Sequence, residues 1–232
     1  MVRANQLNVS VRGPLHISEG KPNQDSALTR AVHNGWLAIV CDGMGSKPFS
    51  QIGSKQACRA VIDTVKSSSF TIDSKELIKS IYQRWLSYLG AIKPTDAVTT
   101  CLFCWLSRDG RIRTFQLGDG LIVVSNVLSK SNDSNNFGNE TTGLGKSTKF
   151  SDWKVQSFTL QTGDAVALMT DGISEDINPG METQFMNEIC NRINGKSFRQ
   201  AKVWLKNELK AWATPNHTDD KSIALLVLNH DK

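Results

Sequence analysis

The chain has 232 residues, of which 39% are hydrophobic and 21% charged, and its formal net charge is +5. This length gives one domain of ordinary size and excludes two. The longest apolar runs are six residues, whereas a membrane-spanning helix needs about 18 or more. The first residues also lack a secretory signal, so we expect one soluble, cytoplasmic domain over residues 1–232.

The excess of basic over acidic residues raises the question of a nucleic-acid partner. The lysines and arginines are scattered, however, with no run of three or more and no basic stripe interleaved with aromatic side chains. A mildly basic solvated surface explains this distribution better. We expect neither nucleic acid nor a membrane as a partner, and a basic nucleic-acid-binding protein is kept as a rival interpretation.

Hydrophobic periodicity divides the chain into strand-like and helix-like segments. In chain order we expect strands at 26–32 and 36–41, helices at 52–65 and 74–89, strands at 99–107, 111–117, 121–126, 155–160 and 165–170, helices at 181–193 and 197–213, and a strand at 222–228. The helices come in pairs and do not alternate with every strand. This order favours an α+β fold with antiparallel sheets over a doubly wound parallel sheet.

Two short turns set the register of the first strands. The Asn-Gly dipeptide at 34–35 predicts a type I′ hairpin, which places Ala27 opposite Asp42. The Asp-Gly dipeptide at 109–110 predicts a second hairpin, which places Thr100 opposite Asp119. In both hairpins an aspartate therefore lies at the open end, away from the turn.

Three more aspartates take similar places. Asp25 precedes the first of these strands, Asp171 follows the strand at 165–170, and Asp220 precedes the last strand. If the last strand runs antiparallel to its neighbours, local turn chemistry can collect all five carboxylates at one edge of the sheets.

Crowded carboxylates repel one another, so such a cluster is stable at neutral pH only around cations. Oxygen ligands without histidine or thiolate select Mg²⁺ or Mn²⁺ rather than Zn²⁺. Asp-Gly pairs are also common simply because both residues favour turns. The spacing alone leaves a metal cluster and a set of ordinary turns open.

Two further motifs are weak. Cys101 and Cys104 have zinc-knuckle spacing, but no second pair accompanies them, and in a strand they would point to opposite faces. We expect the five cysteines to be reduced thiols. Residues 140–147 imitate a phosphate-binding loop, but Glu140 replaces the first required glycine and no helix pattern follows Ser147. We therefore reject nucleotide binding there.

The ordered set of motifs resembles the metal-dependent protein phosphatases of the PPM type, the type 2C serine/threonine phosphatases, and suggests an outlying, bacterial-type member. The matching segments are Asn23-Gln24-Asp25, Val40-Cys41-Asp42-Gly43-Met44-Gly45, Thr99-Thr100, Leu117-Gly118-Asp119, Gly143-Leu144-Gly145, Gly163-Asp164, Met169-Thr170-Asp171-Gly172-Ile173 and Thr218-Asp219-Asp220. Each segment is weak by itself, whereas the set in this order is highly specific.

The resemblance implies a four-layer α-β-β-α sandwich of two antiparallel sheets flanked by helix pairs, with two or three Mn²⁺ or Mg²⁺ ions at one end. The polar, aperiodic loop at 129–152 would be the family's flap beside the active site, a role that fits its length. By the same resemblance the metal-binding residues are Asp25, Asp42, Gly43, Asp119, Asp171 and Asp220.

The resemblance also implies their roles. Asp42 and the carbonyl of Gly43 would bridge two ions, Asp171 and Asp220 would bind them directly, and Asp25 would hold a bound water, while Asp119 would serve a third, weaker site. A hydroxide bridging the ions would attack phosphorus in line, so that Asp25, Asp42, Asp171 and Asp220 are the expected catalytic residues.

Several positions depart from the family pattern. Gly20 stands where an arginine usually clamps the phosphate, and Lys21 or His16 is the expected substitute. Met44 stands where some relatives place a histidine proposed as the general acid, and Lys221 replaces the usual asparagine after Asp220.

These features predict a metal-dependent phosphatase that acts on phosphoserine and phosphothreonine in proteins, as a monomer whose substrates come from a cognate serine/threonine kinase. The missing arginine keeps an alternative open. In that alternative the protein is a catalytically weak pseudophosphatase that acts as a phosphoprotein-binding module.

Overall fold

The structure is a computed structural model that describes residues 2–125, 142–212 and 218–230. Its strands form two antiparallel sheets. The four-stranded sheet has the order β1 (Val2–Val11), β9 (Lys221–His230), β8 (Ala165–Met169), β6 (Leu121–Val124). The five-stranded sheet has the order β2 (Ser26–Val32), β3 (Gly35–Cys41), β4 (Cys101–Ser107), β5 (Arg111–Leu117), β7 (Lys154–Thr159).

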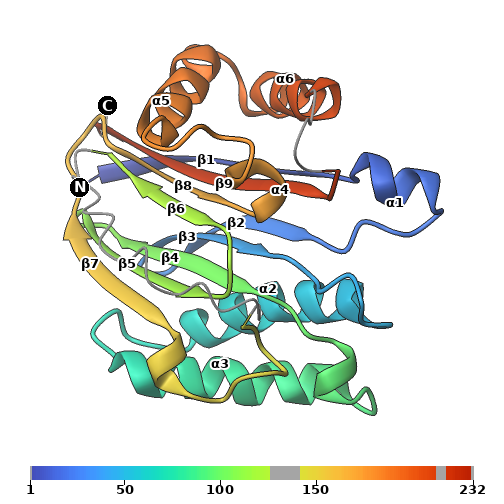
Figure 1. Cartoon of the computed structure of the whole chain (residues 1–232). Coiled ribbons are helices and arrows are strands. Elements are labelled where there is room, and N and C mark those ends of the chain that lie inside the picture. Colours follow the sequence, from blue (N-terminus) through green and yellow to red (C-terminus); the bar gives the residue numbers. More distant parts are fainter. Residues whose placement is uncertain (1, 126–141, 213–217, 231–232) are drawn as a thin grey trace.

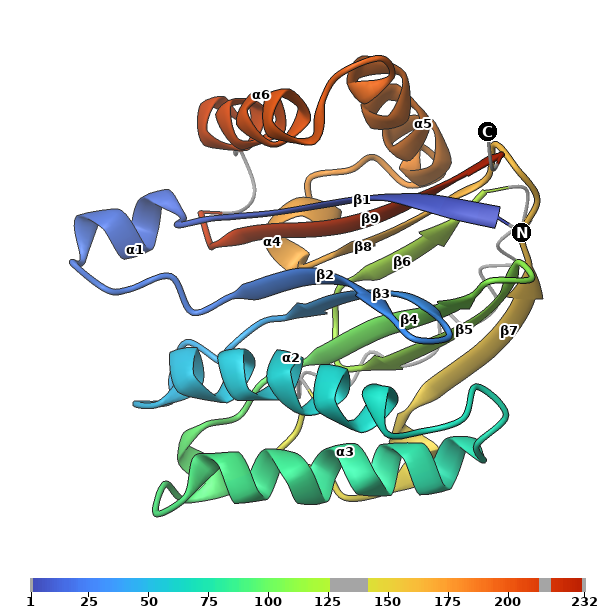
Figure 2. The ribbon, with the colours of Figure 1, turned by 180° about the vertical axis from the view of Figure 1, so that it is seen from behind.

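The helices cover the outer faces of the two sheets. The α-helices are α1 (Pro14–Ser18), α2 (Ser50–Lys66), α3 (Ser74–Leu89), α4 (Asp171–Ser174), α5 (Glu182–Ile193) and α6 (Phe198–Ala211), and two 3₁₀ turns are η1 (Pro94–Asp96) and η2 (Phe150–Asp152). Figure 1 shows α5 and α6 over the four-stranded sheet and α2 and α3 under the five-stranded sheet, and Figure 2 shows the same layers from behind. The α+β sandwich expected from the sequence is confirmed.

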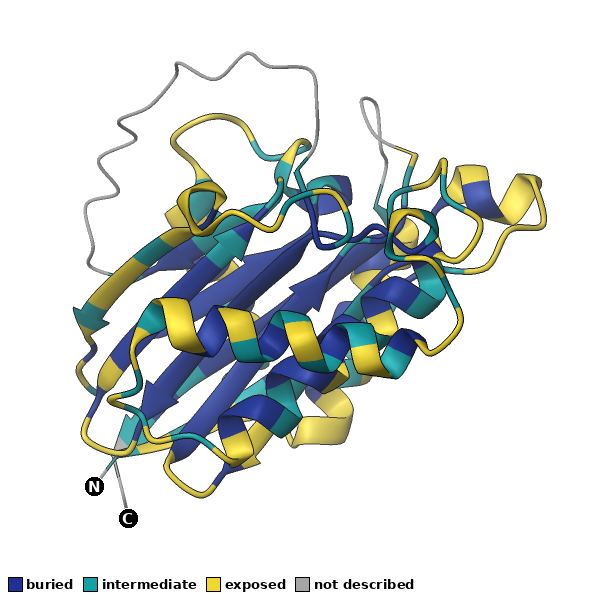
Figure 3. Cartoon of the chain, turned by 90° about the horizontal axis from the view of Figure 1, so that it is seen from below, coloured by how far each residue is buried: buried dark blue, intermediate teal, exposed yellow. Residues whose placement is uncertain are grey.

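The central strands are apolar along their whole length because both of their faces are covered. Every residue of β3 and of β4 is buried, and Figure 3 shows this dark interior beneath α2 and α3. Leu37 and Phe103 point into the core beneath the helices, whereas Ala38 and Leu102 point into the core between the sheets. A strand that is buried on both faces lacks the alternation of apolar and polar residues that is typical of a half-exposed strand.

The Cys101–Cys104 pair follows the same alternation. Cys101 lies in the core beneath the helices and Cys104 in the core between the sheets, and both thiols are free and buried. The expectation of opposite faces is confirmed, and the pair cannot share a metal ion. Among the described residues, no helix combines the length and hydropathy that crossing a membrane requires.

The register expected for the first hairpin is wrong, since each residue of β2 pairs with a residue two positions earlier in the chain than expected. Residues 33–34 form the turn, and Ala27 pairs with Val40 instead of Asp42. Gly35 belongs to β3, where an added Cβ would lie 1.8 Å from the carbonyl oxygen of Leu106. The close approach of β4 therefore requires this glycine inside the strand, and the turn moves back by one residue.

The second hairpin also differs from the expected register. Its loop has three residues, 108–110, and Cys101 pairs with Leu117, so that Thr100 does not face Asp119 as a strand pair. Gly110 has φ 88°, the left-handed conformation that closes three-residue hairpin loops. In both hairpins the aspartates stay at the open end, because the shift is small.

The stacked pair Phe103–Phe115 tests how far this core determines stability. The ring centroids lie 4.4 Å apart and both side chains are fully buried. We expect Phe103→Ala to lower the free energy of unfolding by about 3–5 kcal/mol. The matched change Phe198→Ala, at a side chain that is 56% exposed, should cost less than about 1 kcal/mol. Equal losses in urea unfolding would contradict this assignment of the core.

Candidate active site

The ends of several strands meet at one small acidic cavity. Asp42 follows β3, Asp119 follows β5, Asp171 begins α4 directly after β8, and Asp219 lies just before β9. The cavity has a volume of about 140 Å³ and is lined by Asp42, Met44, Gly45, Val98, Thr99, Thr100, Asp119, Thr142, Gly143, Asp171 and Asp219. The expectation that aspartates gather at one sheet edge therefore holds for Asp42, Asp119 and Asp171.

The backbone around Asp42 is held by the start of β4. The Asp42 amide donates to Thr100 Oγ1 at 2.9 Å, while Thr99 Oγ1 and the Thr100 amide donate to the Asp42 carbonyl at 2.7 and 2.8 Å. An added Cβ on Gly43 would lie 2.6 Å from the carbonyl oxygen of Ser50. The Asp42-Gly43 step is therefore fixed between β4 and α2, and only glycine fits its second position.

Asp25 lies behind this cavity and is buried. Thr170 Oγ1 donates to its Oδ2 at 2.9 Å. Burial, followed by repulsion from Asp220, raises the pKa of Asp25 from its ordinary value of 3.8 to about 8. Burial and the charges of Asp25 and Asp171 likewise hold the pKa of Asp42 well above its usual range. These carboxylates lie so close together that the ionisation of one disfavours the ionisation of the other.

Asp219 lines the cavity, and Asp220, the residue expected from the sequence, does not. Asp220 is 1% exposed and does not line the cavity. Its Oδ1 accepts from the Gly13 amide at 2.7 Å and its Oδ2 accepts from the Gln24 amide at 2.6 Å. Asp219, which sequence reasoning did not select, lines the cavity with Asp42 and Asp171. The two backbone amides hold the Asp220 carboxylate outside the cavity, which leaves Asp219 as the member of the pair that lines it.

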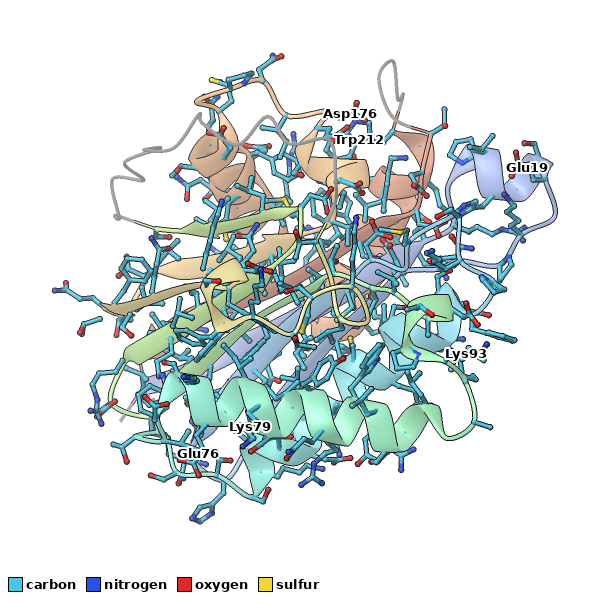
Figure 4. All side chains as sticks on the ribbon, turned by 60° about the horizontal axis from the view of Figure 1, so that its bottom comes forward. Glu19, Glu76, Lys79, Lys93, Asp176 and Trp212 are labelled. Atoms are coloured by element: carbon cyan, nitrogen blue, oxygen red, sulfur yellow. The ribbon has the colours of Figure 1, made fainter. Side chains whose placement is uncertain are left out.

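The two expected phosphate-binding residues, Lys21 and His16, lie outside the acidic cavity. Lys21 Nζ pairs with Glu19 Oε2 at 2.7 Å, and both side chains are more than two-fifths exposed. Figure 4 shows Glu19 at the outer end of α1. His16 is 4% exposed and faces Asp219 and Asp220. Neither residue lines the cavity, and among its described lining residues there is no lysine or arginine.

Lys221 supplies a positive charge to the acidic cluster from behind. Its side chain is buried, and Nζ lies 3.4 Å from the carbonyl oxygen of Asp219. Burial lowers the pKa of Lys221, while the charges of Asp176, Asp219, Asp220 and Asp25 oppose that shift. The sequence marked this residue only as a departure from a family pattern. Its ammonium offsets part of the negative charge without entering the cavity.

The far end of the expected flap contributes to the cavity wall. Leu144 is buried and exchanges backbone hydrogen bonds with Thr99 at 2.8 and 3.2 Å. This pairing holds Thr142 and Gly143 at the rim. Residues 129–141 of the loop lie outside the described residues.

The donor set fits divalent cations. Asp42 interacts by charge with two other lining aspartates, since both Asp171 and Asp219 raise its pKa. No histidine or cysteine lines the cavity among the described residues. Carboxylates that repel one another in a small polar cavity are the environment that Mg²⁺ and Mn²⁺ occupy in proteins.

Comparison with known proteins agrees with this geometry. Residues 12–212 match the family described as protein phosphatase 2C. The chain therefore belongs to the protein phosphatase 2C family, a class of protein serine/threonine phosphatases. No curated protein sequence matches the chain.

Several solved structures share the fold at low sequence identity. The photosystem II phosphatase PBCP is 12% identical with a TM-score of 0.70, and the match covers 97% of this chain and 98% of that one. A serine/threonine phosphatase of S. agalactiae is 14% identical (TM-score 0.65; coverage 97% and 99%). The catalytic domain of the phosphatase PstP, in complex with two manganese ions, is also 14% identical (TM-score 0.62; coverage 99% and 100%).

The raised pKa of Asp25 predicts how stability depends on pH when no cation is present. Between its ordinary value of 3.8 and about 8, the folded protein holds a proton that the unfolded chain releases. Stability should therefore fall as pH rises through this interval, by up to about 1.4 kcal/mol per pH unit for each such proton. Thermal unfolding in EDTA between about pH 5 and pH 8 measures this slope.

The variant Asp25→Asn, which cannot titrate, should flatten that slope. Added Mn²⁺ should raise the melting temperature of the unsubstituted protein more at about pH 8 than at pH 5, because protons compete with the cation. A melting temperature in EDTA that rises with pH across this interval would contradict the assignment.

Proposed function

We propose that this protein hydrolyses phosphoserine and phosphothreonine esters in proteins with the help of Mn²⁺ or Mg²⁺. The observation that carries the proposal is the convergence of Asp42, Asp119, Asp171 and Asp219 on one cavity, in a chain of the protein phosphatase 2C family. The manganese ions named for PstP support the choice of metal class.

Each residue has a proposed task. Asp42, Asp171, Asp219 and the carbonyl of Gly43 would hold two cations, and Asp119 would serve a third, weaker site. Asp219 replaces Asp220 in this set because it faces the cavity. Asp25 would orient a bound water from behind, since Thr170 already holds one of its oxygens.

The cations would supply a water activated near neutral pH and neutralise charge on the phosphoryl oxygens. The chain's own residues fix the positions of the ligands. Thr99 and Thr100 hold the Asp42 backbone through three hydrogen bonds of 2.7–2.9 Å. Gly172 lets α4 approach β9, because an added Cβ there would lie 2.0 Å from the Asp220 carbonyl oxygen. Such a site needs no covalent nucleophile.

A second candidate function follows from the cavity wall. No lysine or arginine lines the cavity among the described residues, and Met44 offers no proton for the leaving group. A protein that binds cations and phosphorylated partners but hydrolyses them slowly would have a cavity with these lining residues. The retained aspartates favour hydrolysis, so this binding module is the second candidate.

Two isosteric substitutions test the proposed function. Asp171→Asn and Asp219→Asn each remove a charged ligand and should lower Mn²⁺-dependent hydrolysis of p-nitrophenyl phosphate at least about 100-fold, because the cations supply several kcal/mol of stabilisation. The matched control is Asp109→Asn, whose exposed side chain pairs with Arg111 in the hairpin turn at the other end of β4 and β5. This control should keep activity within about twofold.

Activity that is independent of Mn²⁺ and Mg²⁺, or unchanged in both variants, would overturn the proposed function. Calorimetric binding of Mn²⁺ without measurable turnover of any phosphopeptide would decide for the second candidate.

A further inference from the structure

A buried imidazole lies against the two carboxylates that precede β9. His16 Nδ1 is 2.9 Å from Asp220 Oδ2 and 3.6 Å from Asp219 Oδ1. The residue is 4% exposed, and Nδ1 forms no hydrogen bond of good geometry with any described residue, although the Asp220 carboxylate lies within reach. An unpartnered buried nitrogen costs about 1–3 kcal/mol. Either an ion pair with Asp220 or a cation held between the imidazole and the two carboxylates would satisfy this nitrogen.

The fold holds these three residues together through the backbone. Figure 1 shows α1 beside the start of β9, and the Leu15 amide donates to the Thr218 carbonyl at 3.1 Å. The Gly13 amide donates to Asp220 Oδ1 at 2.7 Å. An added Cβ on Gly13 would lie 2.2 Å from the Asp219 backbone. Contact this close between α1 and the Asp219–Asp220 segment fixes the imidazole relative to both carboxylates.

The separations fit ligands of a single ion. Metal–nitrogen and metal–oxygen bonds of about 2.0–2.2 Å place neighbouring ligand atoms about 3 Å apart in an octahedral site and about 3.4 Å apart in a tetrahedral one. The distances of 2.9 and 3.6 Å from Nδ1 lie close to these values. One ligand atom from each of the three residues lies within 4.8 Å of the other two.

The oxygens that face Nδ1 keep the capacity to bind. Asp220 Oδ2 accepts one hydrogen bond, from the Gln24 amide at 2.6 Å, and Asp219 Oδ1 accepts one from the Asp220 amide at 2.7 Å. A carboxylate oxygen carries two lone pairs, so each retains one. These amides also orient the carboxylates, as outer-shell donors do in metal sites.

We propose that His16, Asp219 and Asp220 form a metal site of their own, the imidazole–carboxylate site, beside the acidic cavity. One imidazole and two carboxylates suit Zn²⁺, Co²⁺ or Mn²⁺ better than Mg²⁺, which prefers oxygen ligands and retains its water. The site shares Asp219 with the proposed catalytic cavity, but it does not depend on hydrolysis. An ion there would link α1 to β9 and offset the charge of Asp220.

The simpler interpretation is that His16 only donates a hydrogen bond to Asp220 and positions it. Nuclear magnetic resonance separates the two possibilities. Cadmium-113 is the probe ion, added to protein labelled with nitrogen-15 in its histidines at constant pH. A one-bond coupling between cadmium-113 and His16 Nδ1 arises only from a direct bond. We expect this coupling, and its absence at saturating cadmium would overturn the proposal.

Calorimetry with Zn²⁺ and Mg²⁺ gives the second measurement. His16→Gln should raise the Zn²⁺ dissociation constant of the imidazole–carboxylate site at least about tenfold and leave the Mg²⁺ dissociation constants within about twofold. The matched controls are glutamine substitutions at the other three histidines, His33, His217 and His230, which should keep both the coupling and the Zn²⁺ affinity. Loss of the coupling in a control variant, or unchanged Zn²⁺ affinity in His16→Gln, would overturn the assignment.

Neither measurement uses turnover, so the two proposals fail independently. If the cadmium coupling is observed but phosphatase activity is not, the proposed function is wrong and the imidazole–carboxylate site stands. If phosphatase activity is observed but the coupling is not, the imidazole–carboxylate site is wrong and the proposed function stands.

Discussion

Mutual repulsion among buried carboxylates is the constraint on which the rest of this structure depends. Asp25 and Asp42 are forced together by strand ends that leave little room for water, and their pKa values rise as a result. Backbone amides, the Thr170 hydroxyl and the buried Lys221 ammonium compensate only part of the charge. The remaining negative potential suits the cavity to the cation site that we propose, because protons or cations must supply the balance.

A rigid platform is needed to hold such unfavourable neighbours in place. Strands β3 and β4 provide it, since they are buried on both faces and cannot move without opening two cores. Gly43 and Gly172 then let backbone segments approach more closely than any side chain would allow. The energy that packs the apolar core thus also fixes the acidic residues at its edge, as preorganised metal sites require.

Much of this arrangement follows from local sequence patterns. Paired helices, apolar strands and the aspartates after them were sufficient to predict an α+β fold of antiparallel sheets and the placement of Asp42, Asp119 and Asp171 at one end. The four-layer sandwich was implied by the family resemblance. Strand β1 and helix α1 were not predicted, because the polar residues in Val2–Val11 and the short Pro14–Ser18 segment weaken any periodic signal. The register of the first hairpin was off because Gly35 serves the contact between β3 and β4, which lies outside the turn pattern. The register of the second was off because its loop has three residues and is closed by Gly110.

The sequence by itself determined that aspartates follow the strands, since turn chemistry is a local property, and the family resemblance added the expectation of cations. Only the tertiary structure decided which of Asp219 and Asp220 faces the cavity. The Gly13 and Gln24 amides, brought from the other end of the chain, hold Asp220 inward, whereas Asp219 lines the cavity with Asp42 and Asp171. The same contact buried His16, because α1 packs against a segment far away in sequence: Gly13 and Asp220 are 207 residues apart.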